Sequence, residues 1–188
     1  PDEDALPAPI RRLSKWSRDD RALGPIDPPS MLVVEPPDHT RYRRLVSKVF
    51  TARAVEGLRP AVENVAKGLL DQLHGKDEAD LVGSYASLLP VAVISQILGV
   101  PDSDYDKVLR LGHLAAPSLD IGLSYRDYRV VDQAIREFQE WLGAHLDRLR
   151  THPGDDLLSQ LVHLEDEGQR PNQAELKATA GLVLAAGF

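Results

Sequence analysis

Cysteine is absent from the 188-residue sequence, and aromatic residues make up only 5% of it. Without cysteine, the chain itself cannot form disulfides, cysteine-ligated zinc sites, iron–sulfur clusters or a catalytic thiolate. The six histidines include no His-x-x-x-His or His-Glu-x-x-His pair, so no metal-binding signature is present. The sequence also lacks a Gly-x-Ser-x-Gly nucleophile elbow and a phosphate-binding loop. The sequence therefore contains no recognisable motif for thiolate, metal-dependent or serine-nucleophile catalysis, or for binding phosphate in a P-loop.

Long hydrophobic runs are missing as well. The longest apolar stretches cover residues 88–100, which Ser95 and Gln96 interrupt, and residues 181–188. Both are too short to cross a bilayer, so we expect no membrane span, and no signal peptide is recognisable. The chain begins with proline instead of methionine and stops inside an apolar run. We therefore expect an internal piece of a larger protein.

The charge is unevenly distributed along the chain. The net charge of −7 argues against general binding to nucleic acid. Residues 10–53, however, hold ten Lys or Arg against five Asp or Glu. This locally basic region favours an acidic partner or an anionic cofactor.

Helical periodicity dominates from residue 38 onward, which predicts an all-α fold without strands. Residues 1–37 contain eight of the fourteen prolines and predict an irregular loop, with one short helix over 10–16. Pro60 is expected to kink or split the second helix. The predicted helices cover residues 38–50, 52–73, 85–98, 103–116, 126–150, 157–164 and 172 onward. The helix over 85–98 is hydrophobic nearly all round, which is typical of a central buried helix.

The last predicted helix has a clear start and an unusual end. Asn172 with Glu175 three residues later forms the pattern of a capping box. The helix then becomes small and apolar over residues 181–188, with glycine at its middle. A helical glycine costs about 1 kcal/mol relative to alanine, so it indicates either a close helix crossing or the approach of a bulky group.

The helix over residues 38–50 is expected to begin after two prolines, with Asp38 as its cap. At about 100° per residue, one stripe of this helix combines two polar groups with an apolar continuation. That stripe consists of His39, Arg43, Val46 and Phe50, and the opposite face carries Arg41, Arg44 and Lys48. Because unpaired buried charge is costly, an inward His–Arg pair requires an anionic or polar ligand.

Two motifs resemble bacterial cytochromes P450, and residues 1–30 resemble the loop on the distal side of the haem in a mycobacterial or related actinobacterial subfamily. The run Glu35-Pro-Pro-Asp-His-Thr-Arg-Tyr-Arg-Arg, continuing to Arg53, resembles the start of the family's C helix. The run Leu182-Val-Leu-Ala-Ala-Gly-Phe resembles the centre of its I helix. The resemblance implies one helical fragment, residues 1–188, that lacks the N-terminal β-rich part and the C-terminal haem-ligating part of the fold. Its parts would be a distal loop region (1–37), the C helix (38–50), the D and E helices (51–100), the F and G helices (102–150), and the H helix with the first part of the I helix (155–188).

The resemblance also implies roles for individual residues. His39 and Arg43 would bind the propionates of haem b, and the loop residues Met31, Leu32 and Val33 would approach the haem or the substrate. Residues of the last helix would line the distal pocket. Leu182, Ala185 and Ala186 would contact the substrate. Ala186 and Gly187 would lie beside the haem and bound dioxygen. A redox-partner surface would comprise Arg41, Arg44 and Lys48, which would equally suit an ordinary solvated surface.

The activity implied by the resemblance is that of a cytoplasmic haem-thiolate monooxygenase. The parent protein would insert one oxygen atom from dioxygen into an organic, largely hydrophobic small molecule. Electrons would come from NAD(P)H through ferredoxin reductase and ferredoxin. The family's acid–threonine pair would follow Phe188, and the cysteine that ligates the iron is absent from this chain. We therefore expect no catalytic residue or metal ligand within the fragment and no activity from it alone.

Two other hypotheses fit the same residues. The chain is either a helical interaction domain that kept a P450-like sequence without catalysis, or a non-enzymatic carrier that binds an anionic ligand through His39 and Arg43. Continuation of the reading frame into an acid–threonine pair and a later cysteine would separate the enzyme from both alternatives.

Overall fold

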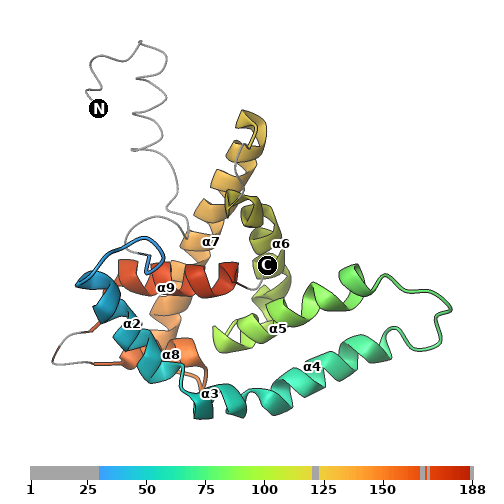
Figure 1. Cartoon of the computed structure of the whole chain (residues 1–188), viewed down its shortest axis with the longest axis horizontal. Helices are drawn as coiled ribbons and strands as arrows, with labels where there is room; N and C mark the ends of the chain where they lie inside the picture. The colour runs from blue at the N-terminus through green and yellow to red at the C-terminus, as the bar shows by residue number, and fades with distance from the viewer. Residues whose placement is uncertain (1–29, 120–122, 166–167, 169, 187–188) are drawn as a thin grey trace.

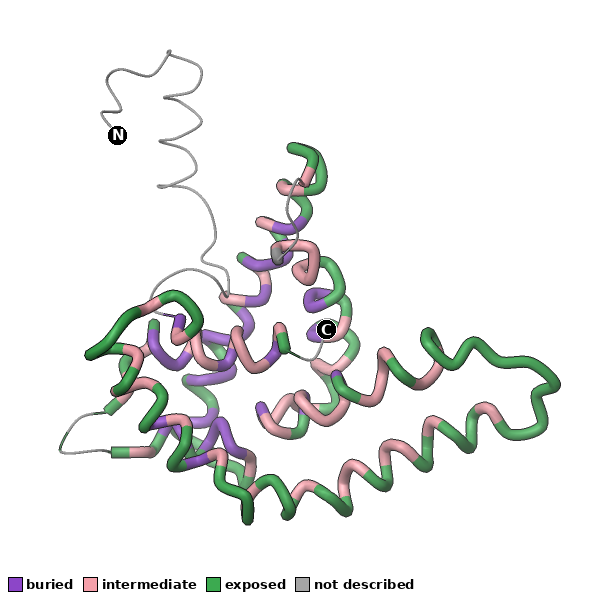
Figure 2. Tube along the Cα trace, viewed as in Figure 1, coloured by how far each residue is buried: buried purple, intermediate pink, exposed green. Residues whose placement is uncertain are grey.

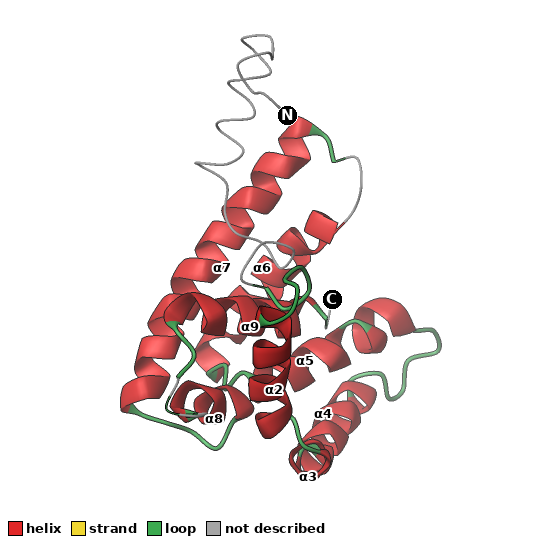
Figure 3. Cartoon of the chain, turned by 60° about the vertical axis from the view of Figure 1, so that its left-hand side comes forward, coloured by secondary structure: helices red, strands yellow, loops and turns green. Residues whose placement is uncertain are grey.

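The computed structural model describes residues 30–119, 123–165, 168 and 170–186, and all the regular structure in these ranges is helical (Figures 1 and 3). This confirms the predicted all-α class. The predicted helix over 10–16, together with Gly187, lies outside the described residues. The α-helices are α2 (Asp38–Val49), α3 (Ala52–Gly57), α4 (Arg59–Asp71), α5 (Leu88–Ile97), α6 (Tyr105–Ala115), α7 (Tyr125–Thr151), α8 (Leu157–His163) and α9 (Gln173–Ala185). Shorter turns are the π-helix η2 (Val82–Ala86) and the 3₁₀ helices η3 (Asp102–Asp104) and η4 (Ala116–Leu119).

Helix α7 is the central element of the fold. Its N-cap is Ser124, whose hydroxyl accepts a hydrogen bond from the Asp127 N–H, and the helix runs for 27 residues. Helix α6 packs along it, and α8 and α9 contact it near its C-terminal half. The buried residues gather where these helices meet (Figure 2). The core includes Val108, Leu111, Leu142, Leu146, Leu158, Leu161, Leu176 and Leu184.

Helices α4 and α5 form an arm that extends from this core (Figures 1 and 2). Helix α4 has no buried residue, and α5 buries only Val91 and Ser95. The range 85–98, predicted as a central buried helix, is only partly buried in the described chain: Val91, Ser95 and Leu98 are buried, and most of the other residues are half-buried. Apolar side chains remain exposed along the arm, among them Leu81 and Val82.

The predicted break near Pro60 is confirmed. Helix α3 ends at Gly57, and α4 begins at Arg59 with Pro60 in its first turn. A proline is tolerated there because the first N–H groups of a helix have no partner within the helix.

Gly99 ends α5 and determines how the chain turns toward α6. Its φ of +61° lies in the left-handed region. The N–H groups of Gly99 and Val100 donate to the carbonyls of Gln96 and Ser95, at 3.1 and 2.8 Å, which is the pattern of a Schellman motif. The Asp156 carboxylate, the N-cap of α8, lies directly against Gly99. The tight turn thus joins the end of α5 to the start of α8.

A buried histidine satisfies the last carbonyl of this turn. His145 of α7 is 2% exposed, and its Nε2 lies 2.7 Å from the Leu98 carbonyl oxygen. Since a carbonyl can only accept, Nε2 carries the proton, and the Arg148 guanidinium donates to the unprotonated Nδ1. The ring also stacks on Trp141, with centroids 5.0 Å apart. This arrangement holds the imidazole neutral.

The environment of His145 makes stability depend on pH. Burial lowers the pKa of the imidazole, and the positive charge of Arg148 lowers it further, against the opposing effects of the Leu98 carbonyl and the carboxylates of Asp104 and Asp156. A lowered pKa in the folded state gives stability that is complete above the unfolded pKa, about 6.5, and is lost as the pH falls below it.

We expect the free energy of unfolding to decrease below pH ~6.5 by up to about 1.4 kcal/mol per pH unit from this one group. His145→Gln keeps a donor and an acceptor but cannot titrate, so its stability profile in urea unfolding should be flatter from pH 7.5 to 5.5. The exposed His74→Gln serves as the control and should keep the wild-type slope. Equal slopes for wild type and His145→Gln would contradict this assignment.

Candidate functional site

Helix α2 contains His39 and Arg43, which the sequence predicted to face inward. Its N-cap is Pro37, which makes no side-chain capping bond, so the prediction of Asp38 as the cap was wrong. Asp38 is instead the first helical residue, where its negative charge interacts favourably with the helix dipole. The His39 N–H donates to the Glu35 carbonyl at 3.1 Å, so the loop before the helix contributes to its first turn.

The core-facing stripe of α2 is not the one that the sequence predicted. Leu45 and Val49 are the buried residues, each 4% exposed, on a helix that packs against α8. His39 is half-buried and Arg43 is exposed, so the His–Arg stripe forms a flank beside the core. The centres of the two stripes are about 110° apart around the helix axis, so when Leu45 and Val49 face the core the His–Arg stripe lies to one side of it.

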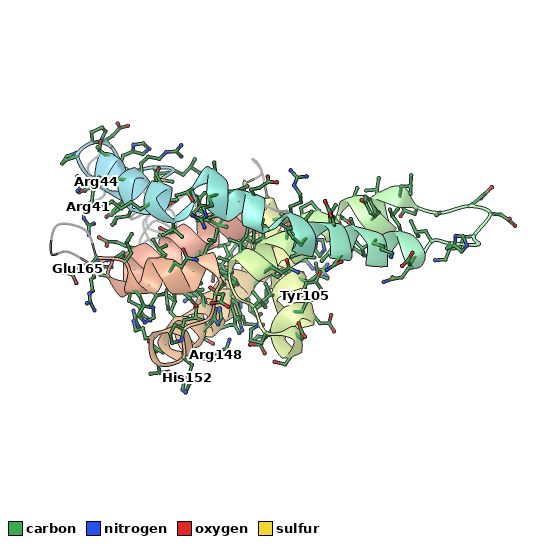
Figure 4. The ribbon with its side chains drawn as sticks, turned by 90° about the horizontal axis from the view of Figure 1, so that it is seen from below. Arg41, Arg44, Tyr105, Arg148, His152 and Glu165 are labelled. Carbon is green, nitrogen blue, oxygen red and sulfur yellow. The ribbon has the colours of Figure 1, made fainter. Side chains whose placement is uncertain are left out.

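Arg41 also lies elsewhere than the sequence predicted, which placed it on the outer face of the helix with Arg44 and Lys48. Its side chain is 27% exposed, and it forms an ion pair with Glu175, at the start of α9. Nη1 donates to Oε1 at 2.7 Å, and Nη2 donates to Oε2 at 3.3 Å. Arg41 therefore faces α9 and does not belong to the solvated outer face of α2 (Figure 4). The missed signal was its position four residues before Leu45, on the same side of the helix.

Glu175 performs two tasks with one carboxylate. The predicted capping box is confirmed: the Glu175 N–H donates to the Asn172 side chain at 3.0 Å, and the Asn172 N–H donates to Glu175 Oε2 at 2.9 Å. Burial by itself would raise the pKa of the Glu175 carboxyl. The hydrogen bonds from Arg41 and Asn172 outweigh it, and the pKa lies below its ordinary value. Glu175 is therefore ionised at neutral pH.

The remaining predicted cations of the outer face are Arg44 and Lys48. Both side chains are exposed on α2, and Figure 4 shows Arg44 close to Arg41. They lie four residues apart and so on one face. This pair keeps the basic character that the sequence predicted for that side.

The loop before α2 presents apolar side chains outward. Ser30 is fully buried, and its backbone carbonyl accepts from the N–H groups of Val33 and Val34. Its hydroxyl accepts from the Leu32 N–H at 3.3 Å. Leu32 is 58% exposed and Val33 is 40% exposed, while Met31 is half-buried. A turn anchored at Ser30 thus carries exposed apolar groups next to the His–Arg flank.

The predicted pocket residues lie on the second half of α9. Leu182 and Ala185 are half-buried and Ala186 is exposed, whereas Leu184 on the other side of the helix is in the core. Leu182 is seven residues after Glu175, about 10 Å along the helix. The small, partly exposed face of α9 is therefore fixed to the same helix that binds Arg41.

The donors of the His–Arg flank suit a carboxylate ligand. A guanidinium binds a carboxylate through two parallel hydrogen bonds, and an imidazole adds one more. Among residues 30–119, 123–165, 168 and 170–186, none forms an ion pair with His39 or Arg43. In the same ranges there is no cluster of His, Asp or Glu that could hold a metal ion. No helix of the described chain is long and apolar enough to span a bilayer.

Comparison with known proteins gives consistent matches. The chain is 54% identical over 187 residues to cytochrome P450 140 of Mycobacterium tuberculosis, a match that covers 97% of the chain and 42% of that protein. It is 40% identical over 183 residues to the vitamin D(3) 25-hydroxylase of Pseudonocardia autotrophica, covering 94% of the chain and 44% of that protein. The solved structure of the Bacillus subtilis cytochrome P450 PksS superposes with a TM-score of 0.77 at 35% identity, covering 84% of this chain and 39% of that one.

These relatives are longer proteins, and the chain spans less than half the length of each. No model of a known protein family matches the chain.

Proposed function

The chain belongs to the cytochrome P450 family, and on this premise we propose that the whole protein is a haem-thiolate monooxygenase. It would insert one oxygen atom from dioxygen into an organic, hydrophobic small molecule, with electrons from NAD(P)H delivered through ferredoxin reductase and ferredoxin. The observation that carries the proposal is the flank of His39 and Arg43, two donors for carboxylates beside an exposed apolar loop. The hydroxylase name of the Pseudonocardia relative supports a hydrophobic substrate.

The residues of this chain would hold and surround haem b, which supplies the activation of dioxygen when it is bound. His39 and Arg43 would bind the propionates through charge-assisted hydrogen bonds. Met31, Leu32 and Val33 would contact the haem or the substrate from the turn at Ser30. Leu182 and Ala185 of α9, together with Ala186 and Gly187 after it in the sequence, would exclude water from the reacting groups.

A carbon monoxide spectrum of the reduced whole protein tests this function. We expect the Soret shift of a thiolate-ligated haem from the full-length protein. Residues 1–188 alone contain no cysteine and should not give that shift, which makes the isolated chain a matched control. A full-length protein that folds but gives no thiolate-type spectrum would refute the monooxygenase. That result would favour a non-catalytic helical or ligand-binding domain.

We also propose that Arg44 and Lys48 belong to the surface that receives the acidic ferredoxin. Replacing both by glutamate should slow reduction by ferredoxin about tenfold or more at low ionic strength, since steering between opposite charges raises association rates by 10–10³. Substrate binding and haem content should stay unchanged, because both side chains are exposed on the outer face of α2. Salt should reduce the difference between variant and wild type. Equal reduction rates would contradict this surface.

A further inference from the structure

We propose that the Arg41–Glu175 ion pair fixes the rotation of α2 about its axis, and with it the direction in which the haem-binding flank of His39 and Arg43 points relative to α9. This inference rests on the proposed function and assigns Arg41 a role other than docking a redox partner. Arg41 and Glu175 would be positioning residues, since neither contacts haem or substrate in this assignment. The pair would determine the orientation of His39 and Arg43 relative to Leu182 and its neighbours.

The contact joins two distant parts of the sequence. Arg41 and Glu175 are 134 positions apart, and both guanidinium–carboxylate bonds link α2 directly to the first turn of α9. The same carboxylate completes the capping box with Asn172, so it cannot move without disturbing the start of α9. A bidentate bond between planar groups also fixes their orientation, not only their distance.

Because Arg41 lies between His39 and Arg43 in α2, the ion pair determines the direction in which these two side chains point. His39 and Arg43 lie two residues before and two residues after Arg41. On an α-helix two residues correspond to a rotation of about 200°, so the flank points away from α9 when Arg41 points toward it. Any rotation of α2 about its axis would break the ion pair and turn both propionate donors. Leu45 and Val49 pack on the core but, as apolar side chains, fix this rotation less strictly.

Helix α9 connects the ion pair in its first turn with the predicted pocket residues in its second half. Glu175 and Leu182 are seven residues apart, which places them on the same face about 10 Å apart along the axis. Leu176, Ala180 and Leu184 anchor the helix in the core between and beside them. The ion pair at the first turn therefore fixes where the second half of α9 lies along its axis relative to α2.

Arg41 and Glu175 are both partly buried, so the loss of either partner is expected to be destabilising. The side chains are 27% and 10% exposed, so removing one partner leaves a charge that water solvates only in part. The Arg41 guanidinium also lies over the Tyr42 ring, 5.4 Å from its centroid, which restricts its alternatives. The ion pair of Arg59 with Glu56 provides a contrast, because its N–O distance is 2.6 Å but both side chains are more than 60% exposed.

The test compares Arg41→Gln, Glu175→Gln and the double variant in the full-length haem protein. Glu175→Gln keeps one acceptor for the Asn172 N–H, and it removes the charge and one of the two oxygens that accept from the Arg41 guanidinium. We expect each single variant to release haem to apomyoglobin roughly five- to tenfold faster, as expected for a lost, partly buried charged hydrogen bond. The double variant should release haem no faster than the single variants, because the two residues act as one unit. Arg59→Gln is the control and should behave as wild type.

Two further readouts separate positioning from general stabilisation. Haem release is measured well below the unfolding temperature, and the reduction potential of the bound haem should shift in both single variants. Additive effects of the two substitutions, or release rates equal to wild type, would overturn the inference. Wild-type protein without haem would instead refute the proposed function. In that case a double-mutant cycle on urea unfolding still tests the pair, and the absence of coupling would overturn it.

Discussion

Replacing His39 and Arg43 together by alanine is expected to weaken haem binding to the full-length protein by about 10- to 100-fold. Each residue would donate a charge-assisted or neutral hydrogen bond to a propionate, with a net value of roughly 1–3 kcal/mol in partly buried sites and less where water competes. Arg43 is exposed in the described chain, so its contribution depends on the haem itself for burial. The dissociation constant can be measured by titrating apoprotein with haemin.

This expectation is specific because the flank contributes little to the packing of the chain. Leu45 and Val49 bury a different side of α2, so the double alanine variant should keep its helix content and unfolding midpoint. Arg53→Ala, an exposed arginine in α3, is the control for a general loss of positive charge. Haem affinity that is unchanged in the double variant would remove the propionate assignment.

Replacing Gly99 by alanine is expected to lower the free energy of unfolding by about 3 kcal/mol. The left-handed backbone alone costs a non-glycine residue roughly 1–2 kcal/mol. A Cβ at this position would also lie 2.5 Å from Cγ and Oδ2 of Asp156. That carboxylate accepts from the Ser159 N–H at 2.7 Å and caps α8, and a lost N-cap costs about 1 kcal/mol more.

Gly75 provides a matched control for the two contributions. Its φ is +77°, but a Cβ added there would meet no atom within 4 Å, so Gly75→Ala should cost only about 1 kcal/mol. Urea unfolding of both variants separates backbone strain from the clash with Asp156. In the double variant Gly99→Ala/Asp156→Ala the two effects should be less than additive. Equal losses for Gly99→Ala and Gly75→Ala would show that the Asp156 contact is unimportant.

Local features of the fold were predictable from the sequence because their causes are local. The break at Pro60 and the Asn172–Glu175 capping box each depend on residues within one turn of one another. Proline geometry and side-chain capping act over that range. The structure confirms both of them.

The orientation of α2 was not predictable in the same way. Apolar residues occur on two neighbouring stripes of this helix, Leu45 with Val49 and Val46 with Phe50. Periodicity gives the stripes but not which of them meets α8 and α9, since those helices lie more than 100 residues further along. For the same reason the ion pair of Arg41 could not be inferred, although the capping role of Glu175 could. The half-exposed surface of α5 likewise depends on tertiary neighbours.

The distance in sequence between Arg41 and Glu175 also has a consequence for the order of folding. Contacts between distant segments form after local ones, because closing a long loop costs entropy before any contact stabilises it. Helices α6 and α7 are neighbours in the chain and can pair early, whereas α2 can dock only when α8 and α9 are present. During synthesis the ribosome makes α9 more than 100 residues after α2. Helix α2 therefore reaches its final orientation late, and under the proposed function haem would meet its complete binding flank only after α9 has folded.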